Sequence, residues 1–387
     1  MAGADAIRIG LLFSVTGTYR TIGKSMLNGA RLALEEINEN ADFPFRLEAV
    51  SADPGGCNEH YAEAAEWMLA DERLAHVVGC YTSSSRKEVL PFFEKHDGLL
   101  WYPSHYEGFE SSEHVVYTGA APNQHILPLA EWLLDHCGNS AFFIGSNYIW
   151  AWENNKIMRE AVQAAGGEVL AERYLPVGET DFSGLIKKIL STRPSFVFNT
   201  LIGESAYAFF RQFRKAAQAA GIDQQRDMPI ASCSLAEPEL VEIGRGAAAG
   251  HISSSVYFET VRGAANRAFL DRYRDRFPDA GPVCADVEAS YIAVLLLAKA
   301  IRAAGTTAMV EVRAAVTDLA LDAPQGKVLV DPDNRHCYLT PRIGISNEAF
   351  GFDLIYQAPG PVKPDPYLVW NEPRERILPP PRLRLVE

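Results

Sequence analysis

The fold of this chain is decided by the stretch HVVGCYTSSSRK at residues 76–87, taken together with LLWYPSHYEG at residues 99–108. Each stretch begins with an apolar run typical of a buried strand and then changes to hydroxyl and aromatic side chains. In an open parallel sheet, ligands bind beyond the carboxyl ends of the strands. Two successive strand ends of this composition therefore predict a site that holds a small polar molecule between aromatic rings and uncharged hydrogen-bonding groups.

Strand-like and helix-like segments alternate on both sides of this pair. A first series has expected strands at residues 7–13, 45–52, 76–81, 99–102 and 115–118. A second series begins after residue 121, with expected strands at residues 141–145, 168–174, 196–201, 229–232 and 251–258. Amphipathic runs such as residues 25–38, where apolar side chains recur with a period near 3.6, predict the helices between them.

This alternation predicts an α/β fold of two doubly wound lobes, each with a parallel sheet covered by helices, joined by more than one crossover. The length of 387 residues also favours two domains over one. The first lobe is expected to comprise residues 1–121 and 256–330, and the second residues 122–255 and 331–387. A ligand cleft then lies between the lobes, with hinge segments near residues 119–123 and 253–255.

The charge and the apolar runs limit the kinds of partner. The net charge is −13 and the isoelectric point about 5.3. Because affinity for phosphates is built from clustered Lys and Arg, direct binding of nucleic acid is not expected. No apolar run approaches the roughly 20 residues of a membrane-spanning helix, so membrane insertion is not expected either. Residues 1–5 carry no Lys or Arg and lead into the first strand, which predicts a cytoplasmic location. A periplasmic location is the alternative if a leader has been removed.

The six cysteines lie at positions 57, 80, 137, 233, 284 and 337, and none forms a Cys-x-x-Cys pair. This spacing argues against structural zinc and dithiol redox chemistry, and reduced thiols are expected. A disulfide between Cys57 and Cys80 stays open at this point. Such a bond would indicate an oxidising compartment.

The sequence lacks the common arrangements of catalytic residues. It contains no His-Glu-x-x-His run, no Gly-x-Ser-x-Gly elbow and no phosphate loop. The run GRGAAAG at residues 244–250 has the wrong spacing for a dinucleotide loop and precedes an expected strand. Ser83 and Lys87 could suggest a Ser–Lys hydrolase, but the surrounding glycines of such amidases are missing. We therefore expect a protein that is not an enzyme and has no cofactor or metal.

Several short motifs, in order along the whole chain, are similar to those of one family. They are SVTG at 14–17, DPGG at 53–56, GCYTS at 79–83, YP at 102–103, YEG at 106–108, APNQ at 121–124, IGSNY at 144–148, DAPQG at 322–326 and DPY at 365–367. Together they resemble the AmiC-type amide sensors, which are negative regulators of aliphatic amidase expression, and the related urea-binding proteins of ABC importers. The resemblance implies a type I periplasmic-binding protein-like fold with three crossovers.

The resemblance also implies a ligand site, with Tyr81 and Ser83 at one strand end, Tyr102 at the next and Tyr148 from the second lobe. The chain departs from the amide sensors by having Ser104-His105 after its Tyr-Pro pair and Trp150 in place of a second tyrosine. Glu204 is closer to the urea-binding branch, which has an acid there. The full set of expected ligand contacts is Tyr81, Thr82, Ser83, Tyr102, Ser104, His105, Tyr148, Trp150 and Glu204.

Simpler roles remain open for several of these residues. Tyr102 and Tyr148 could pack the lobes, since a buried tyrosine needs only one hydrogen-bond partner. Glu204 could be an acid favoured by the positive end of a helix, and Ser83 could serve the start of the helix that follows it.

Two functions follow from the resemblance. The first is a cytoplasmic sensor, in which a small neutral amide or urea-like ligand closes the lobes and changes the affinity for an RNA-binding antiterminator partner. The alternative is a periplasmic substrate-binding protein that delivers urea or short amides to the permease of an ABC importer. An amidohydrolase is a third hypothesis, which no nucleophile or metal arrangement in the sequence supports.

Overall fold

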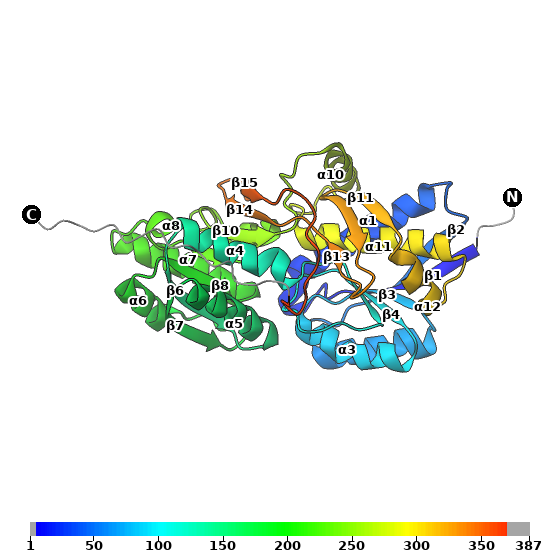
Figure 1. Ribbon diagram of the computed structural model, residues 1–387, viewed down its shortest axis with the longest axis horizontal. Coiled ribbons are helices and arrows are strands. Elements are labelled where there is room, and N and C mark those ends of the chain that lie inside the picture. The colour runs from blue at the N-terminus through cyan, green and yellow to red at the C-terminus, as the bar shows by residue number, and fades with distance from the viewer. Residues whose placement is uncertain (1–4, 370–387) are drawn as a thin grey trace, which may run out of the picture.

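A computed structural model describes residues 5–369 and has two α/β lobes side by side along the long axis of the molecule (Figure 1). The first lobe contains a five-stranded sheet in the order β2-β1-β3-β4-β5, in which all neighbouring strands are parallel. Its strands are β1 (Asp5–Leu12), β2 (Phe45–Ala52), β3 (His76–Gly79), β4 (Leu99–Tyr102) and β5 (Val115–Tyr117). Strands β3 and β4 are buried along their whole length, which explains their continuous apolar character.

Helices cover both faces of this sheet. They are α1 (Arg20–Glu39), α2 (Asn58–Glu66), α3 (Ser83–Lys95), α10 (Ala264–Arg276), α11 (Ala285–Ala304) and α12 (Met309–Val316), with short turns η1 (Gly17–Tyr19) and η2 (Trp67–Asp71). Helices α1 and α11 are in close contact at Gly29, where a Cβ atom would lie 2.3 Å from the carbonyl oxygen of Val287. Only glycine allows this contact, because any larger residue would separate the two helices.

The second lobe contains a seven-stranded sheet in the order β15-β14-β10-β9-β8-β6-β7. Its strands are β6 (Ser140–Ser146), β7 (Glu168–Leu175), β8 (Phe196–Thr200), β9 (Ile230–Ser232), β10 (Ile252–Ser255), β14 (Arg342–Ser346) and β15 (Phe352–Gln357). The strands from β10 to β7 run parallel, and β14 and β15 add an antiparallel edge. Its helices are α4 (Pro122–His136), α5 (Ile149–Ala164), α6 (Ser183–Thr192), α7 (Gly203–Ala219), α8 (Gln224–Asp227) and α9 (Glu237–Ile243).

A small antiparallel sheet shifts one expected lobe boundary. It consists of β11 (Ala320–Ala323), β12 (Gly326–Val330) and β13 (Cys337–Tyr338), with β13 paired to β12. Leu321, Val328 and Cys337 share one buried cluster with the strands and helices of the first lobe. The expected boundary at residue 331 therefore falls inside a sheet of the first lobe, and the chain enters the second lobe only at β14.

The chain passes between the lobes three times, which matches the crossovers implied by the resemblance. The crossings are residues 118–121 between β5 and α4, residues 256–263 between β10 and α10, and residues 339–341 between β13 and β14. The hinge expected at residues 253–255 lies inside β10, and this crossing begins immediately after that strand. The predicted two-lobed α/β fold is confirmed, and its parallel sheets direct several strand ends towards the space between the lobes (Figure 1).

Within residues 5–369, no single helix combines the length and the apolar character that a membrane crossing requires. The bent pair of α11 and α12 meets these criteria only when the two helices are taken together.

Candidate functional site

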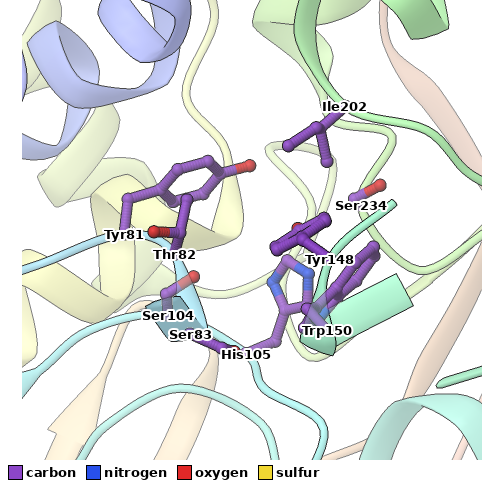
Figure 2. A pocket seen from close by; sticks show the side chains of 9 residues that line it. All are labelled: Tyr81, Thr82, Ser83, Ser104, His105, Tyr148, Trp150, Ile202 and Ser234. Atoms are coloured by element: carbon purple, nitrogen blue, oxygen red, sulfur yellow. The ribbon is translucent and has the colours of Figure 1, made fainter. Parts of the chain in front are cut away.

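A small cavity between the lobes collects residues from the ends of several strands (Figure 2). About 240 Å³ of space not filled by protein atoms lies in it, and part of this space is open to solvent. The first lobe contributes Tyr81, Thr82, Ser83, Ser104 and His105, and the second contributes Tyr148, Trp150, Ile202 and Ser234. The side chains of the two lobes face each other across this space (Figure 2). Its size suits a solute of only a few heavy atoms.

The segment between β3 and α3 carries the first group of lining residues. Cys80 directly follows β3 and has a φ angle of +65°, a left-handed conformation that costs a residue with a Cβ atom about 1–2 kcal/mol. Thr82 is the N-cap of α3, and its hydroxyl accepts a hydrogen bond from the amide of Ser85 at 3.1 Å. The amides of Ser83 and Ser84 belong to the first helical turn, which has no intrahelical acceptor for them. They are donors available for an oxygen atom beside the helix end.

A buried ionic cluster lies behind Ser83. The Ser83 hydroxyl donates a hydrogen bond to Glu107 Oε2. Glu107 Oε1 lies 3.3 Å from Nη2 of Arg86, whose Nε donates to Glu110 at 2.6 Å. Arg86 is fully buried, and Lys87 approaches both carboxylates from the surface. The cluster fixes the position of the Ser83 hydroxyl from the side opposite the cavity.

Ser104 and His105 follow β4 and contact a buried carboxyl from α11. Ser104 Oγ donates to Asp286 Oδ1 at 3.1 Å, and His105 Nδ1 lies 3.9 Å from the same oxygen. Burial raises the pKa of Asp286 to about 7 despite the hydrogen bond from Ser104. Burial, with a smaller effect of the neighbouring His125, lowers the pKa of His105 to about 3. The imidazole of His105 is therefore neutral at physiological pH.

The second lobe closes the cavity with aromatic and small side chains. Tyr148 is the N-cap residue of α5, and Trp150 lies in its first turn. The ring of Trp150 lies 5.5 Å from that of His105 in an edge-to-face arrangement, which is a direct contact between the lobes. Ile202 precedes α7, and Ser234 follows β9. The cavity is therefore lined by residues that follow five strands, β3 and β4 of the first lobe and β6, β8 and β9 of the second.

Two of the nine expected ligand contacts lie outside this cavity. Tyr102 is fully buried, donates its hydroxyl to the carbonyl of Tyr81 at 2.9 Å and packs against the guanidinium of Arg86. Tyr102 therefore packs behind the cavity, in line with the alternative that it is a packing residue and not a ligand contact. Glu204 is exposed in the first turn of α7 and pairs with Arg211 at 2.6 Å, so its carboxylate is engaged at the surface instead of in the cavity.

The other seven residues, Tyr81, Thr82, Ser83, Ser104, His105, Tyr148 and Trp150, line the cavity together with two that the sequence analysis missed. The missed residues are Ile202 and Ser234. Each lies two residues after a buried strand of the second lobe, so the strand-end rule could have identified them. The resemblance to the urea-binding branch led instead to Glu204, two positions beyond Ile202.

Metal and disulfide chemistry receive no support within residues 5–369. No group of three or more His, Cys, Asp or Glu side chains there is arranged to hold a metal ion. All six cysteines are free thiols, so Cys57 and Cys80 are not joined. Cys80 is buried, and burial raises the pKa of its thiol to about 12.

Two α/β lobes that are joined by three crossings and enclose a small polar cavity define the class of two-lobed solute-binding proteins. The chain matches the family described as periplasmic binding protein domain over residues 7–373, and it belongs to that family. The match covers nearly the whole chain. It supports the predicted fold class, whereas the narrower resemblance to amide sensors stays a prediction.

Individual relatives are distant but cover most of the chain. A Brucella abortus protein named Leu/Ile/Val-binding protein homolog 6 is 22% identical over 364 residues, which is 92% of this chain and 90% of that protein. A leucine-, isoleucine-, valine-, threonine- and alanine-binding protein from Pseudomonas aeruginosa is 24% identical over 334 residues, covering 85% of this chain and 86% of that protein.

Solved structures with low sequence identity share the fold. A solute-binding protein of an ABC transporter from Rhodopseudomonas palustris, in complex with p-hydroxybenzoic acid, has a TM-score of 0.85 at 19% identity. It covers 95% of this chain and 100% of its own. The branched-chain amino acid binding protein LivJ from Streptococcus pneumoniae, in complex with isoleucine, has a TM-score of 0.79 at 20% identity, covering 93% of this chain and 100% of its own.

Proposed function

We propose that this protein binds a short amide or a urea-like molecule between its lobes and presents it to an ABC importer. The main observation in support of this proposal is that the side chains lining the cavity are uncharged. Eight of the nine lining residues have uncharged side chains, and the ninth, His105, is neutral because burial lowers its pKa to about 3. A charged solute would lose its hydration there without a lining group of opposite charge, which is costly.

The cavity has donors and acceptors placed for such a ligand. The carbonyl oxygen of an amide accepts from the amides at the start of α3, where the helix dipole also favours negative partial charge. The hydroxyls of Ser83 and Ser104 are on the same side, and Tyr148 and Trp150 cover the ligand from the second lobe. Residues of both lobes contact one ligand, so binding favours the closed state over the open one.

The family and the names of similar proteins favour the importer role over the sensor role. The Rhodopseudomonas palustris and Streptococcus pneumoniae proteins are transporter binding proteins in complex with p-hydroxybenzoic acid and isoleucine, and the Pseudomonas aeruginosa protein is named for binding amino acids. None of them supports sequestration of an antiterminator. The cytoplasmic location expected from the sequence is likewise unsupported, and the proposal places the protein outside the cytoplasmic membrane. Fractionation of cells that express the native gene tests the location.

Isothermal titration calorimetry tests the ligand class. The panel consists of acetamide, propionamide, formamide and urea, with leucine, isoleucine and 4-hydroxybenzoate as competing classes. Short amides or urea should bind, and the larger charged solutes should not. Replacement of Ser83 by Ala should weaken amide binding about 5- to 20-fold, as expected for one lost hydrogen bond. The matched variant Ser84→Ala, in the same helical turn but outside the cavity lining, should bind like the wild type. Binding of leucine or 4-hydroxybenzoate alone would refute the proposed ligand class.

A cellular assay separates import from sensing. Deletion of the gene should reduce uptake of a radiolabelled short amide or urea at low external concentration. The Ser83→Ala gene should restore uptake only partly, and the Ser84→Ala gene fully. Unchanged uptake combined with altered amidase expression would support the sensor and overturn the importer.

A further inference from the structure

Glu107 is a buried acid that lies behind the cavity and is absent from its lining. Only 1% of its surface is exposed. Its two carboxylate oxygens have different partners: Oε1 lies 3.3 Å from Nη2 of Arg86, and Oε2 accepts the hydrogen bond from the Ser83 hydroxyl. The carboxylate of Glu107 can only accept and the guanidinium of Arg86 can only donate. The Ser83 hydroxyl therefore donates to Glu107, while its oxygen accepts from Nη1 of Arg86 at 3.5 Å.

We infer that Glu107 determines the specificity of the site by fixing the Ser83 hydroxyl as a hydrogen-bond acceptor towards the ligand. This inference rests on the proposed function. The single proton of Ser83 is committed to Glu107, and its oxygen also accepts a hydrogen bond from Nη1 of Arg86 at 3.5 Å. The oxygen therefore has one remaining lone pair, and no proton, to offer to the cavity. A ligand must therefore bring an N–H or O–H group to Ser83.

Ser104 has the same polarity on the other side of the site. Its hydroxyl donates to Asp286 at 3.1 Å and also turns its proton away from the cavity. The start of α3, in contrast, offers amide donors. A solute that combines one acceptor oxygen with an NH₂ group matches this arrangement, whereas a ketone or ester brings no donor to the two serine oxygens. Glu107 thus acts as a positioning residue that selects amides and ureas by their N–H groups.

Replacement of Glu107 by Gln tests the direction of the hydrogen bond. Arg86 has no acceptor atom, so the amide oxygen of the new side chain should turn to Arg86 and its NH₂ group to Ser83. Ser83 would then accept from Gln and donate into the cavity. The measured quantity is the ratio of the dissociation constants for 2-butanone and propionamide, which differ by CH₃ in place of NH₂. We expect a wild-type preference of about 10-fold or more for the amide, reduced at least 5-fold in Glu107→Gln.

Glu110→Gln is the matched control. Glu110 also pairs with Arg86, at 2.6 Å, but its carboxylate contacts Lys87 and Tyr117 instead of Ser83, and it does not line the cavity. Its replacement should leave the ratio unchanged. In the Ser83→Ala background, Glu107→Gln should also have no further effect on the ratio, because the hydroxyl through which it acts is gone. Equal ratios in Glu107→Gln, Glu110→Gln and the wild type would overturn the inference.

Ser83→Ala alone provides a test that does not require the Glu107 variant to fold. If Ser83 only accepts, its loss should weaken propionamide and leave 2-butanone unchanged. Equal weakening of both ligands would show that Ser83 donates to the carbonyl, and would overturn the inference while leaving the proposed function intact. Failure of the wild type to bind propionamide or any other amide would refute the proposed function itself.

Discussion

Replacement of Arg86 by Met should destabilise the protein far more than the loss of a surface cation. The guanidinium is fully buried, pairs with Glu107 and Glu110, and lies 4.8 Å and 4.6 Å from the ring centroids of Tyr102 and Tyr106. Met fills much of the same volume but leaves two carboxylates without their buried partner. Removing one partner of a buried ion pair costs about 3–5 kcal/mol.

The control for this prediction is Lys95→Met. Lys95 pairs with Glu66 at 2.8 Å, but 61% of its side chain is exposed. Exposed pairs of this kind contribute about 0–1 kcal/mol. Urea unfolding of the two variants, followed by circular dichroism at pH 7, should therefore separate them by several kcal/mol in the free energy of unfolding. Similar losses in both variants would refute the idea that the buried cluster stabilises the first lobe through its charges.

The pH dependence of the same variants gives a second readout. Burial raises the pKa of Glu110, but the charges and hydrogen bonds of Arg86 and Lys87 outweigh this effect and lower the pKa to about 2. A depressed pKa contributes stability above the ordinary value of 4.5, and this contribution is lost as the pH falls towards 2. The difference between wild type and Arg86→Met should therefore shrink as the pH is lowered from 5 to 2. A constant difference over this range would contradict the reasoning.

Three further predictions concern Gly119 in the first crossing between the lobes, the buried acid Asp286 and the cavity residue Trp150. Gly119→Ala should lower the unfolding free energy by about 2 kcal/mol or more, because its Cβ would lie 2.0 Å from a backbone carbonyl carbon. Gly281→Ala, which has open space, should change it by less than about 0.5 kcal/mol. Asp286 has a pKa raised to about 7, so stability present below pH 4 is lost as the pH rises through 7. Asp286→Asn should therefore reduce the change of melting temperature with pH between pH 4 and 7. The same change with pH as in the wild type would contradict this. Trp150 lines the cavity, so Trp150→Phe should abolish the change in tryptophan fluorescence on ligand binding. Trp152 is exposed, so Trp152→Phe should retain this change.

The sequence predicts the sheets well because their strands carry strong local patterns. The expected strands at residues 45–52 and 99–102 have the same bounds in the structure. The lobe boundary at residue 331 was wrong because β13 is only two residues long, and its pairing with β12 depends on the assembled core. A strand of this length has no periodicity to detect.

The site is predicted where the ligand-facing residues follow a strand end with a distinctive composition. The strand-end rule predicts the segment that contains Tyr81 and Ser83, and the resemblance names these two residues within it. Glu204, which was also named from the resemblance, lies exposed in the first turn of α7 and pairs with Arg211. Glu107 was quoted as part of a motif, but its contact with Ser83 joins residues 24 positions apart and depends on the packing of the loop after β4.

The enclosure of the cavity by both lobes has a kinetic consequence. Most of the lining side chains are buried, and the ring contact between His105 and Trp150 joins the two lobes at this cavity. If a solute binds here as proposed, it should leave mainly when the lobes separate, so its escape rate would have an upper limit set by the opening rate. Solutes that stabilise the closed state to different extents should then differ mainly in residence time and much less in the rate at which they are captured. The delivery rate to a partner would depend on how well that partner holds the lobes apart.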